Sequence, residues 1–185
     1  MLKIKPQKYN SVWISADSQA ELNITFMRFT EHYESPNPNF RNHIFTIGQL
    51  KNWYSITYGA DTYHKDWSGF NIPSSVLKPF YQGLFDPLIK EEQSLLELFK
   101  YRDDNFYIIG AQDNSVLRHE LAHALYGFNI RYRTAIDSCI LKNKTSLYKT
   151  SKYILDKGYC KDVLNDEIQA YITDNDDEYI IKNLS

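Results

Sequence analysis

The sequence lacks the features that mark several common protein classes. It contains only two cysteines, Cys139 and Cys160, which are too few for a disulfide framework and match no zinc-knuckle or redox spacing. Its 21 basic and 23 acidic side chains nearly balance, and a net charge of -2 provides no field that would attract nucleic acid or an anionic membrane. No apolar run approaches the roughly 20 residues needed to cross a bilayer. We therefore expect neither nucleic acid nor a membrane as a partner.

Targeting and linker signals are also missing. The opening segment MLKIKPQKYNSVW has no apolar stretch of the kind found in secretory signals, so we expect a cytoplasmic protein with reduced cysteines. No internal repeat and no Gly/Ser-rich linker divides the 185 residues. This length suits one domain that buries its core without disulfides or a structural metal. The expectation is a single domain over residues 1–185.

Runs of β-branched and aromatic residues predict strands in the first half of the chain. Aromatic residues make up 15% of the sequence, with fifteen Tyr and ten Phe. The predicted strands are Ser11–Ser15, Leu22–Thr30, His43–Ile47 and Tyr54–Tyr58. Further along, Phe106–Gly110 has the same character, and Tyr179–Ile181 is a weaker candidate.

Helical periodicity dominates the second half. Apolar residues at near-helical spacing predict a helix over Pro87–Tyr101. Another is predicted over Ser115–Tyr126, with competent N-caps at residues 113–115 and Gly127 as its stop. Beyond Arg131 the pattern indicates two or three more helices. The predicted fold class is α+β: a small N-terminal mixed sheet and a helical C-terminal part.

The predicted helix Ser115–Tyr126 carries the pattern HExxH, as HELAH at residues 119–123. Positions i and i+4 of a helix project from one face, so His119 and His123 can both reach one zinc ion at about 2.0–2.1 Å. Glu120 leans beside that position, close enough to take a proton from a water molecule. In a chain with only five histidines, chance produces the pattern in roughly one sequence in a hundred or fewer. The competing interpretation is a surface helix whose two histidines happen to be four residues apart.

A catalytic zinc site needs a third protein ligand and leaves its fourth position to water. A metzincin takes this ligand from HExxHxxGxxH, but Tyr126 and Asn129 occupy the glycine and last histidine positions, which excludes that class. Glu167 is the stronger candidate, because a helix over 162–172 places it within an otherwise apolar stripe. A buried carboxylate must be paired or coordinate a metal.

Other roles and other acidic residues compete with this assignment. Glu167 could instead form a buried salt bridge with Arg118, Arg131 or Arg133. Weaker acidic candidates for the metal are Asp166, which points to the next face, Asp137, which stands alone, and Glu178, which lies in an acidic run.

The segments HELAHALYG and DEIQAY resemble the gluzincin branch of zinc metallopeptidases, in which HExxH on one helix is completed by a Glu on a later helix. The resemblance implies a zincin-like fold and the zinc ligands His119, His123 and Glu167. It implies Glu120 as general base and then proton shuttle in the hydrolysis of a peptide or protein substrate. It also implies that the strand Phe106–Gly110 is the sheet edge on which an extended substrate lies, since an edge offers unpaired N–H and C=O groups.

Supporting residues of the site are less well defined. Many gluzincins have an Asp four residues after the Glu ligand, where it orients a zinc histidine, and here that position is Tyr171. The orienting role then falls to Asp137, Asn165 or a backbone carbonyl. The group that stabilises negative charge on the substrate oxygen is equally open, the candidates being Tyr126, Tyr132, His64 and an arginine.

Two further interpretations keep the zinc but not the peptidase. One is a different zinc amide hydrolase; a deformylase is disfavoured, because its cysteine ligand precedes the motif and both cysteines here follow it. The other is a zinc-peptidase-like regulatory or binding module that retains the motif as a structural or sensor site. Glu120 favours chemistry, because a structural site has no need of a general base. The leading hypothesis is a zinc metallopeptidase that acts as an endopeptidase or cuts short peptides.

Overall fold

The computed structural model describes residues 1–174, in which four short strands form one mixed sheet. The strands are β1 (Lys3–Gln7), β2 (Ser11–Ser15), β3 (Gly69–Pro73) and β4 (Tyr107–Ala111). They lie in the order β1-β2-β4-β3, with β2 and β4 parallel and the two outer pairs antiparallel. The outer strands are therefore β1 and β3, while β4 lies inside the sheet.

Helices make up most of the regular structure, which confirms a mixed α+β class with more helix in the first half than the sequence predicts. Before the last strand the helices are α1 (Gln19–Glu34), α2 (Ile47–Tyr58), α3 (Tyr63–Asp66), η1 (Ser74–Leu77), α4 (Lys78–Tyr81) and α5 (Lys90–Phe99). After it come α6 (Asn114–Phe128), α7 (Ile130–Lys142), α8 (Tyr148–Asp156), η2 (Lys161–Val163) and α9 (Leu164–Asp174). None of the described helices is both long enough and apolar enough to cross a membrane.

Three of the strands predicted for the first half are wrong. Residues 22–30 belong to α1 and residues 54–58 to α2, while 43–46 have no regular structure and residue 47 begins α2. Leu22, Phe26 and Phe29 are fully buried at helical spacing, so core packing of this face overrides the β propensity of the run. Thr46 forms a capping box with Gln49, which starts α2 where a strand is predicted to end.

Other predicted elements are confirmed. Ser11–Ser15 is β2, and α5 and α6 lie where the two helices are predicted, each within a few residues of the predicted ends. Gly127 is not the stop of its helix: α6 continues to Phe128, and a Cβ at Gly127 would overlap the ring of Tyr107 in β4. This glycine instead lets α6 approach the sheet closely. The predicted strand Tyr179–Ile181 and the acidic residue Glu178 lie outside the described residues.

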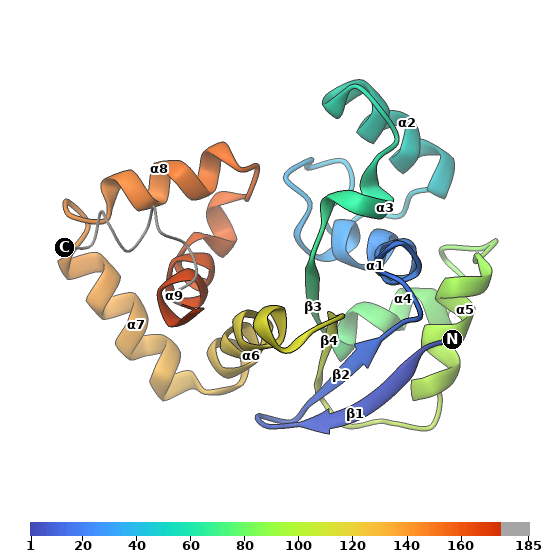
Figure 1. Cartoon of the computed structure of the whole chain (residues 1–185), viewed down its shortest axis with the longest axis horizontal. Coiled ribbons are helices and arrows are strands. Elements are labelled where there is room, and N and C mark those ends of the chain that lie inside the picture. The colour runs from blue at the N-terminus through green and yellow to red at the C-terminus, as the bar shows by residue number, and fades with distance from the viewer. Residues whose placement is uncertain (175–185) are drawn as a thin grey trace.

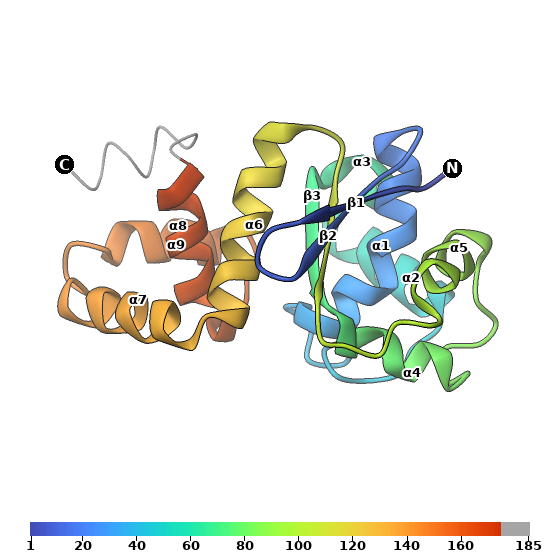
Figure 2. The same cartoon turned by 90° about the horizontal axis from the view of Figure 1, so that it is seen from below.

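The sheet is covered on both faces, by α1 on one side and α6 on the other (Figures 1 and 2). Alternation along β4 explains this arrangement, since successive side chains of a strand point to opposite faces. Ile108 packs in the large core that contains α1, whereas Tyr107, Ile109 and Ala111 pack in the smaller core with α6. All of these side chains are buried.

The remaining helices lie on the side of α6 that faces away from the sheet (Figures 1 and 2). Helix α9 packs along α6, and α7 and α8 pack against α9. Leu147, Ile154 and Ile168 form the buried centre of this group. Helix α6 is therefore the element that joins the sheet to the C-terminal helices.

Candidate metal centre

The HExxH motif lies on α6, one short loop after β4. Asp113 fixes the start of this helix, because its side chain accepts hydrogen bonds from the backbone N–H groups of Ser115 (2.9 Å) and Val116 (3.2 Å). Helix α9 then brings Glu167 to the same face of α6. The two helices thus bring the three predicted ligands close together.

His119, His123 and Glu167 form a group that could hold a metal ion. One ligand atom from each lies within 4.8 Å of the other two, and no other set of three His, Cys, Asp or Glu residues does so within residues 1–174. The Nε2 atoms of His119 and His123 lie 3.9 Å and 3.7 Å from the Glu167 carboxylate oxygens. Two ligand atoms on a tetrahedral zinc ion lie roughly 3.4 Å apart. The separations therefore fit one ion after small side-chain adjustments.

The environment of Glu167 supports this fit. Its side chain is only 4% exposed, and its Oε2 atom is buried with no hydrogen-bond partner. Burial raises the pKa of Glu167 to about 7, and the neighbouring His123 opposes that shift. No Lys or Arg of the described chain lies within 4 Å of this carboxylate, so the predicted alternative of a buried salt bridge is not found there. A buried carboxylate oxygen without a donor is suited to a cation.

The two histidines differ in their surroundings. Burial, and then the proximity of His123, lowers the pKa of His119 to about 3, which keeps this imidazole neutral, as a metal ligand must be. Burial alone would also lower the pKa of His123, but the carboxylates of Asp166 and Glu167 outweigh it and raise that pKa. The Nδ1 atom of His123 lies 2.9 Å from Oδ1 of Asp166. This contact leaves Nε2 directed toward Glu167.

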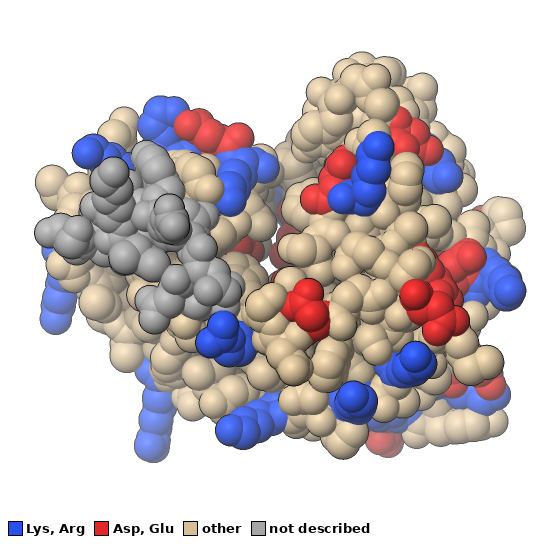
Figure 3. Space-filling model, viewed as in Figure 1, with Lys and Arg blue, Asp and Glu red and all other residues tan. Residues whose placement is uncertain are grey.

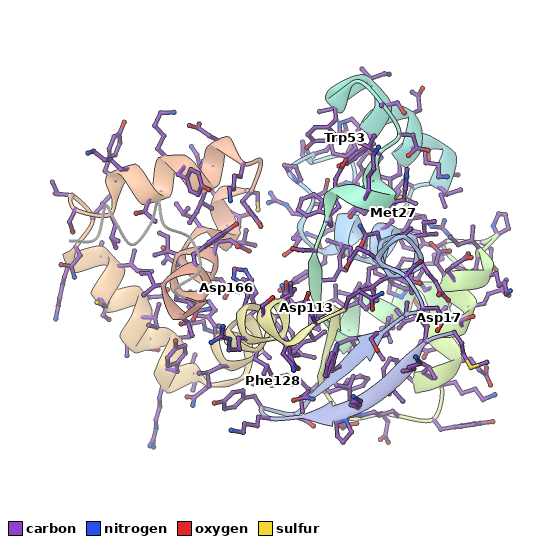
Figure 4. All side chains as sticks on the ribbon, viewed as in Figure 1. Asp17, Met27, Trp53, Asp113, Phe128 and Asp166 are labelled. Carbon is purple, nitrogen blue, oxygen red and sulfur yellow. The ribbon has the colours of Figure 1, made fainter. Side chains whose placement is uncertain are left out.

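Asp166 therefore makes the contact with a motif histidine for which the sequence offers Asp137, Asn165 or a backbone carbonyl. Figure 4 places Asp166 on the side of α9 that faces α6. The other two residues contact each other instead, since Asn165 donates to Asp137 at 2.9 Å, and Asp137 also accepts from the hydroxyl of Tyr126 at 2.6 Å. The prediction for Asp137 and Asn165 is thus wrong. The sequence places Asp166 on a different helix face from Glu167, and that face meets His123.

Strand β3 positions Glu120, the expected general base. The Nδ2 atom of Asn71 donates a hydrogen bond of 3.0 Å to Oε2 of Glu120, and both side chains are buried. Two residues earlier, a Cβ at Gly69 would overlap both Val116 and the Glu120 carboxylate, so only glycine lets the strand lie this close to α6. The Glu120 side chain is therefore held in place from the sheet side.

This geometry also corrects the predicted substrate edge. The segment Phe106–Gly110 corresponds to β4, which pairs with β2 on one side and β3 on the other and so has no free edge. The outer strand beside the motif is β3. The sequence does not predict β3, because its residues, GFNIP, include glycine and proline, which are depleted in strands.

A cavity of about 590 Å³ opens next to the motif and includes His119 and Glu120 in its wall. This volume is typical of sites that bind small molecules or short peptides. In Figure 3 the surface is hollowed between the part formed by α8 and α9 and the part formed by α2 and α3, with acidic atoms visible in its depth. Aromatic residues from both sides line the cavity: Tyr54, Tyr58, Trp67, Tyr159 and Tyr171.

The groups predicted to stabilise a negatively charged substrate oxygen do not line this cavity. The hydroxyl of Tyr126 is bonded to Asp137, the hydroxyl of Tyr132 donates to Gln169 at 3.0 Å, and His64 lies on α3 outside the wall. Tyr159 lies in the wall instead, together with Tyr171, whose ring packs edge-on against His119 at 5.0 Å. Burial raises the pKa of Tyr159, so its hydroxyl keeps the proton that a donor needs.

Comparison with models of known protein families, with curated proteins and with solved structures found no match to this chain. The candidate site is therefore defined by its own geometry.

Proposed function

We propose that this protein is a zinc-dependent hydrolase of peptide bonds with a zincin-like arrangement of its sheet, motif helix and C-terminal helices. In this proposal His119, His123 and Glu167 hold the ion, and Glu120 is the general base. The convergence of these four side chains around one small cavity carries the proposal, and His119 and Glu120 also line the larger cavity. Two imidazoles and one carboxylate are a ligand set typical of hydrolytic zinc sites, which keep a position open for water.

The chain's own residues supply the acid–base chemistry. When bound, zinc polarises a carbonyl group and lowers the pKa of water toward about 7. The Glu120 carboxylate takes a proton from the attacking water and returns it to the leaving amine. Asn71 keeps Oε2 of that carboxylate in a fixed orientation. Tyr159, which lies in the cavity wall, is the donor that we assign to the developing negative charge on the substrate oxygen.

The outer strand β3 is the surface that we assign to the substrate backbone. Its N–H and C=O groups on the side away from β4 pair with no other described strand, so an extended peptide can add to this edge. Gly69, at the start of β3, lies in the cavity wall with His119 and Glu120. A peptide bound there would pass the proposed metal ligands, and its side chains would meet the aromatic wall.

Replacement of Glu120 by glutamine tests the proposal. The variant should keep its zinc and its stability to urea but cleave an unfolded protein substrate roughly 10²- to 10⁴-fold more slowly, because the amide cannot accept the proton. The same exchange at Glu97, an exposed residue of α5, is the matched control and should leave cleavage unchanged. A Glu120→Gln protein as active as the wild type would exclude this base. A zinc-loaded wild type that cleaves no peptide would favour a binding or regulatory module.

A further inference from the structure

A second and smaller cavity, of about 60 Å³, contains the proposed metal centre in its wall. One side of its wall is formed by the proposed ligands His119, His123 and Glu167 together with Glu120. Its opposite wall comes from the last two turns of α1, through Glu31 and Glu34, and from Trp67. The proposed chemistry gives no role to Glu31 or Glu34.

Polar atoms without partners are concentrated around this cavity. Seven buried side-chain nitrogen or oxygen atoms of the described chain lack a hydrogen-bond partner. Four of them belong to residues that line the small cavity: Thr30 Oγ1, Glu31 Oε2, Trp67 Nε1 and Glu167 Oε2. Buried polar groups in folded proteins almost always find a partner, so such a cluster indicates a space built for a polar occupant.

The carboxylates of Glu31 and Glu34 in the cavity wall favour a positively charged occupant. Glu31 is 3% exposed and Glu34 is partly buried, and they lie three residues apart on one face of α1. Ionised carboxylates only accept hydrogen bonds. No Lys, Arg or His of residues 1–174 forms an ion pair with either of them. Burial raises the pKa of Glu31 to about 7, and hydrogen bonds from Ser35 and Tyr63 oppose that shift only in part.

We propose that Glu31 and Glu34 form a subsite for a primary ammonium group of the substrate. This inference rests on the proposed function, because the subsite adjoins the residues assigned to peptide hydrolysis. An ammonium group offers three donors to the two carboxylates. The group can belong to a free peptide N-terminus or to the end of a lysine side chain.

A second metal ion between Glu31 and Glu34 is less favoured by the geometry. Within the described residues, His119, His123 and Glu167 are the only set of three potential ligands that comes close enough to hold an ion. Glu31 and Glu34 belong to no such set. A second ion there would thus lack the number of protein ligands that His119, His123 and Glu167 offer.

Binding to the zinc-loaded Glu120→Gln protein tests the subsite without turnover. The probes are trialanine amide, its N-acetyl form, and N-acetyl-alanyl-lysyl-alanine amide, titrated by calorimetry. An ammonium-bearing probe should bind about 10- to 100-fold more tightly than the N-acetyl-trialanine amide, since its charge-assisted hydrogen bonds replace unpaired carboxylates. Preference for trialanine amide would identify the peptide N-terminus as the source, and preference for the lysyl peptide would identify the side chain.

Glu31→Gln or Glu34→Gln should abolish this preference and leave the zinc content unchanged, whereas the Glu97→Gln control should keep the preference. Equal binding of all three probes would overturn the subsite, as would a second zinc ion that is lost in the Glu31→Gln variant. Cleavage assays with the wild type separate the two proposals. Cleavage of the acetylated and free peptides at equal kcat/KM overturns the subsite alone, while a zinc-loaded wild type that cleaves neither peptide contradicts the proposed function.

Discussion

Replacing Asp166 with asparagine should weaken zinc binding although Asp166 is not a ligand. Its Oδ1 atom lies 2.9 Å from Nδ1 of His123, and the two side chains are 16% and 3% exposed. A carboxylate in this position fixes the ring so that Nε2 faces the ion, and it increases the basicity of the ring. Asparagine keeps an acceptor oxygen of the same shape but removes the negative charge.

The size of the effect follows from that difference. A hydrogen bond to a charged group contributes about 1.5–3 kcal/mol and a neutral one about 1 kcal/mol. The loss of roughly 1–2 kcal/mol corresponds to zinc affinity about 5- to 30-fold lower in Asp166→Asn. In Asp166→Ala the acceptor is lost entirely, so affinity should fall by about 10- to 100-fold.

Competition with a chromophoric chelator measures these affinities directly. The matched control is Asp162→Asn, because Asp162 is 76% exposed, lies four residues earlier in the chain and pairs with Arg41 at 3.2 Å. Its zinc affinity should equal that of the wild type. Unchanged affinity in both Asp166 variants, with unfolding curves like that of the wild type, would refute the orienting role.

Three further variants probe other parts of the structure. Asn71→Leu should lower kcat about tenfold with little change in KM, because a buried donor to Glu120 is lost; an unchanged kcat in steady-state kinetics would contradict this. Glu92→Met should lower the free energy of unfolding in urea by about 3–5 kcal/mol, since it leaves Arg28 as a buried unpaired charge. The pKa of Glu31 is raised from 4.5 to about 7, so the folded state holds a proton that the unfolded state releases. Stability should therefore fall by up to about 3 kcal/mol as pH rises from 4.5 to 7, and Glu31→Gln should reduce this slope, as urea titrations at several pH values would show.

The sequence predicts the parts of the site that depend on local periodicity. HExxH specifies two imidazoles on one helix face, and the apolar stripe around Glu167 places a carboxylate on the buried face of α9. Both follow from 3.6 residues per turn and need no knowledge of the tertiary structure. The structure brings these three residues together as predicted.

The other site residues depend on how distant elements pack, which periodicity does not encode. Asn71 contacts Glu120 from strand β3, which the sequence does not predict because the strand contains glycine and proline. Asp166 contacts His123 only because of the way in which α9 packs on α6. Glu31 and Glu34 lie on α1, whose aromatic and β-branched residues predict a strand. A correct helix prediction for that segment would have placed both carboxylates on one face, but not beside the motif.

Elemental analysis of the purified protein, prepared without chelators, tests the proposed metal centre most directly. We expect about one zinc ion per chain in the wild type and in the Glu97→Ala control, and far less in Glu167→Ala, because that variant removes one of three protein ligands. Zinc that persists in Glu167→Ala, or a wild type that binds none when zinc is supplied, would contradict the assignment of His119, His123 and Glu167.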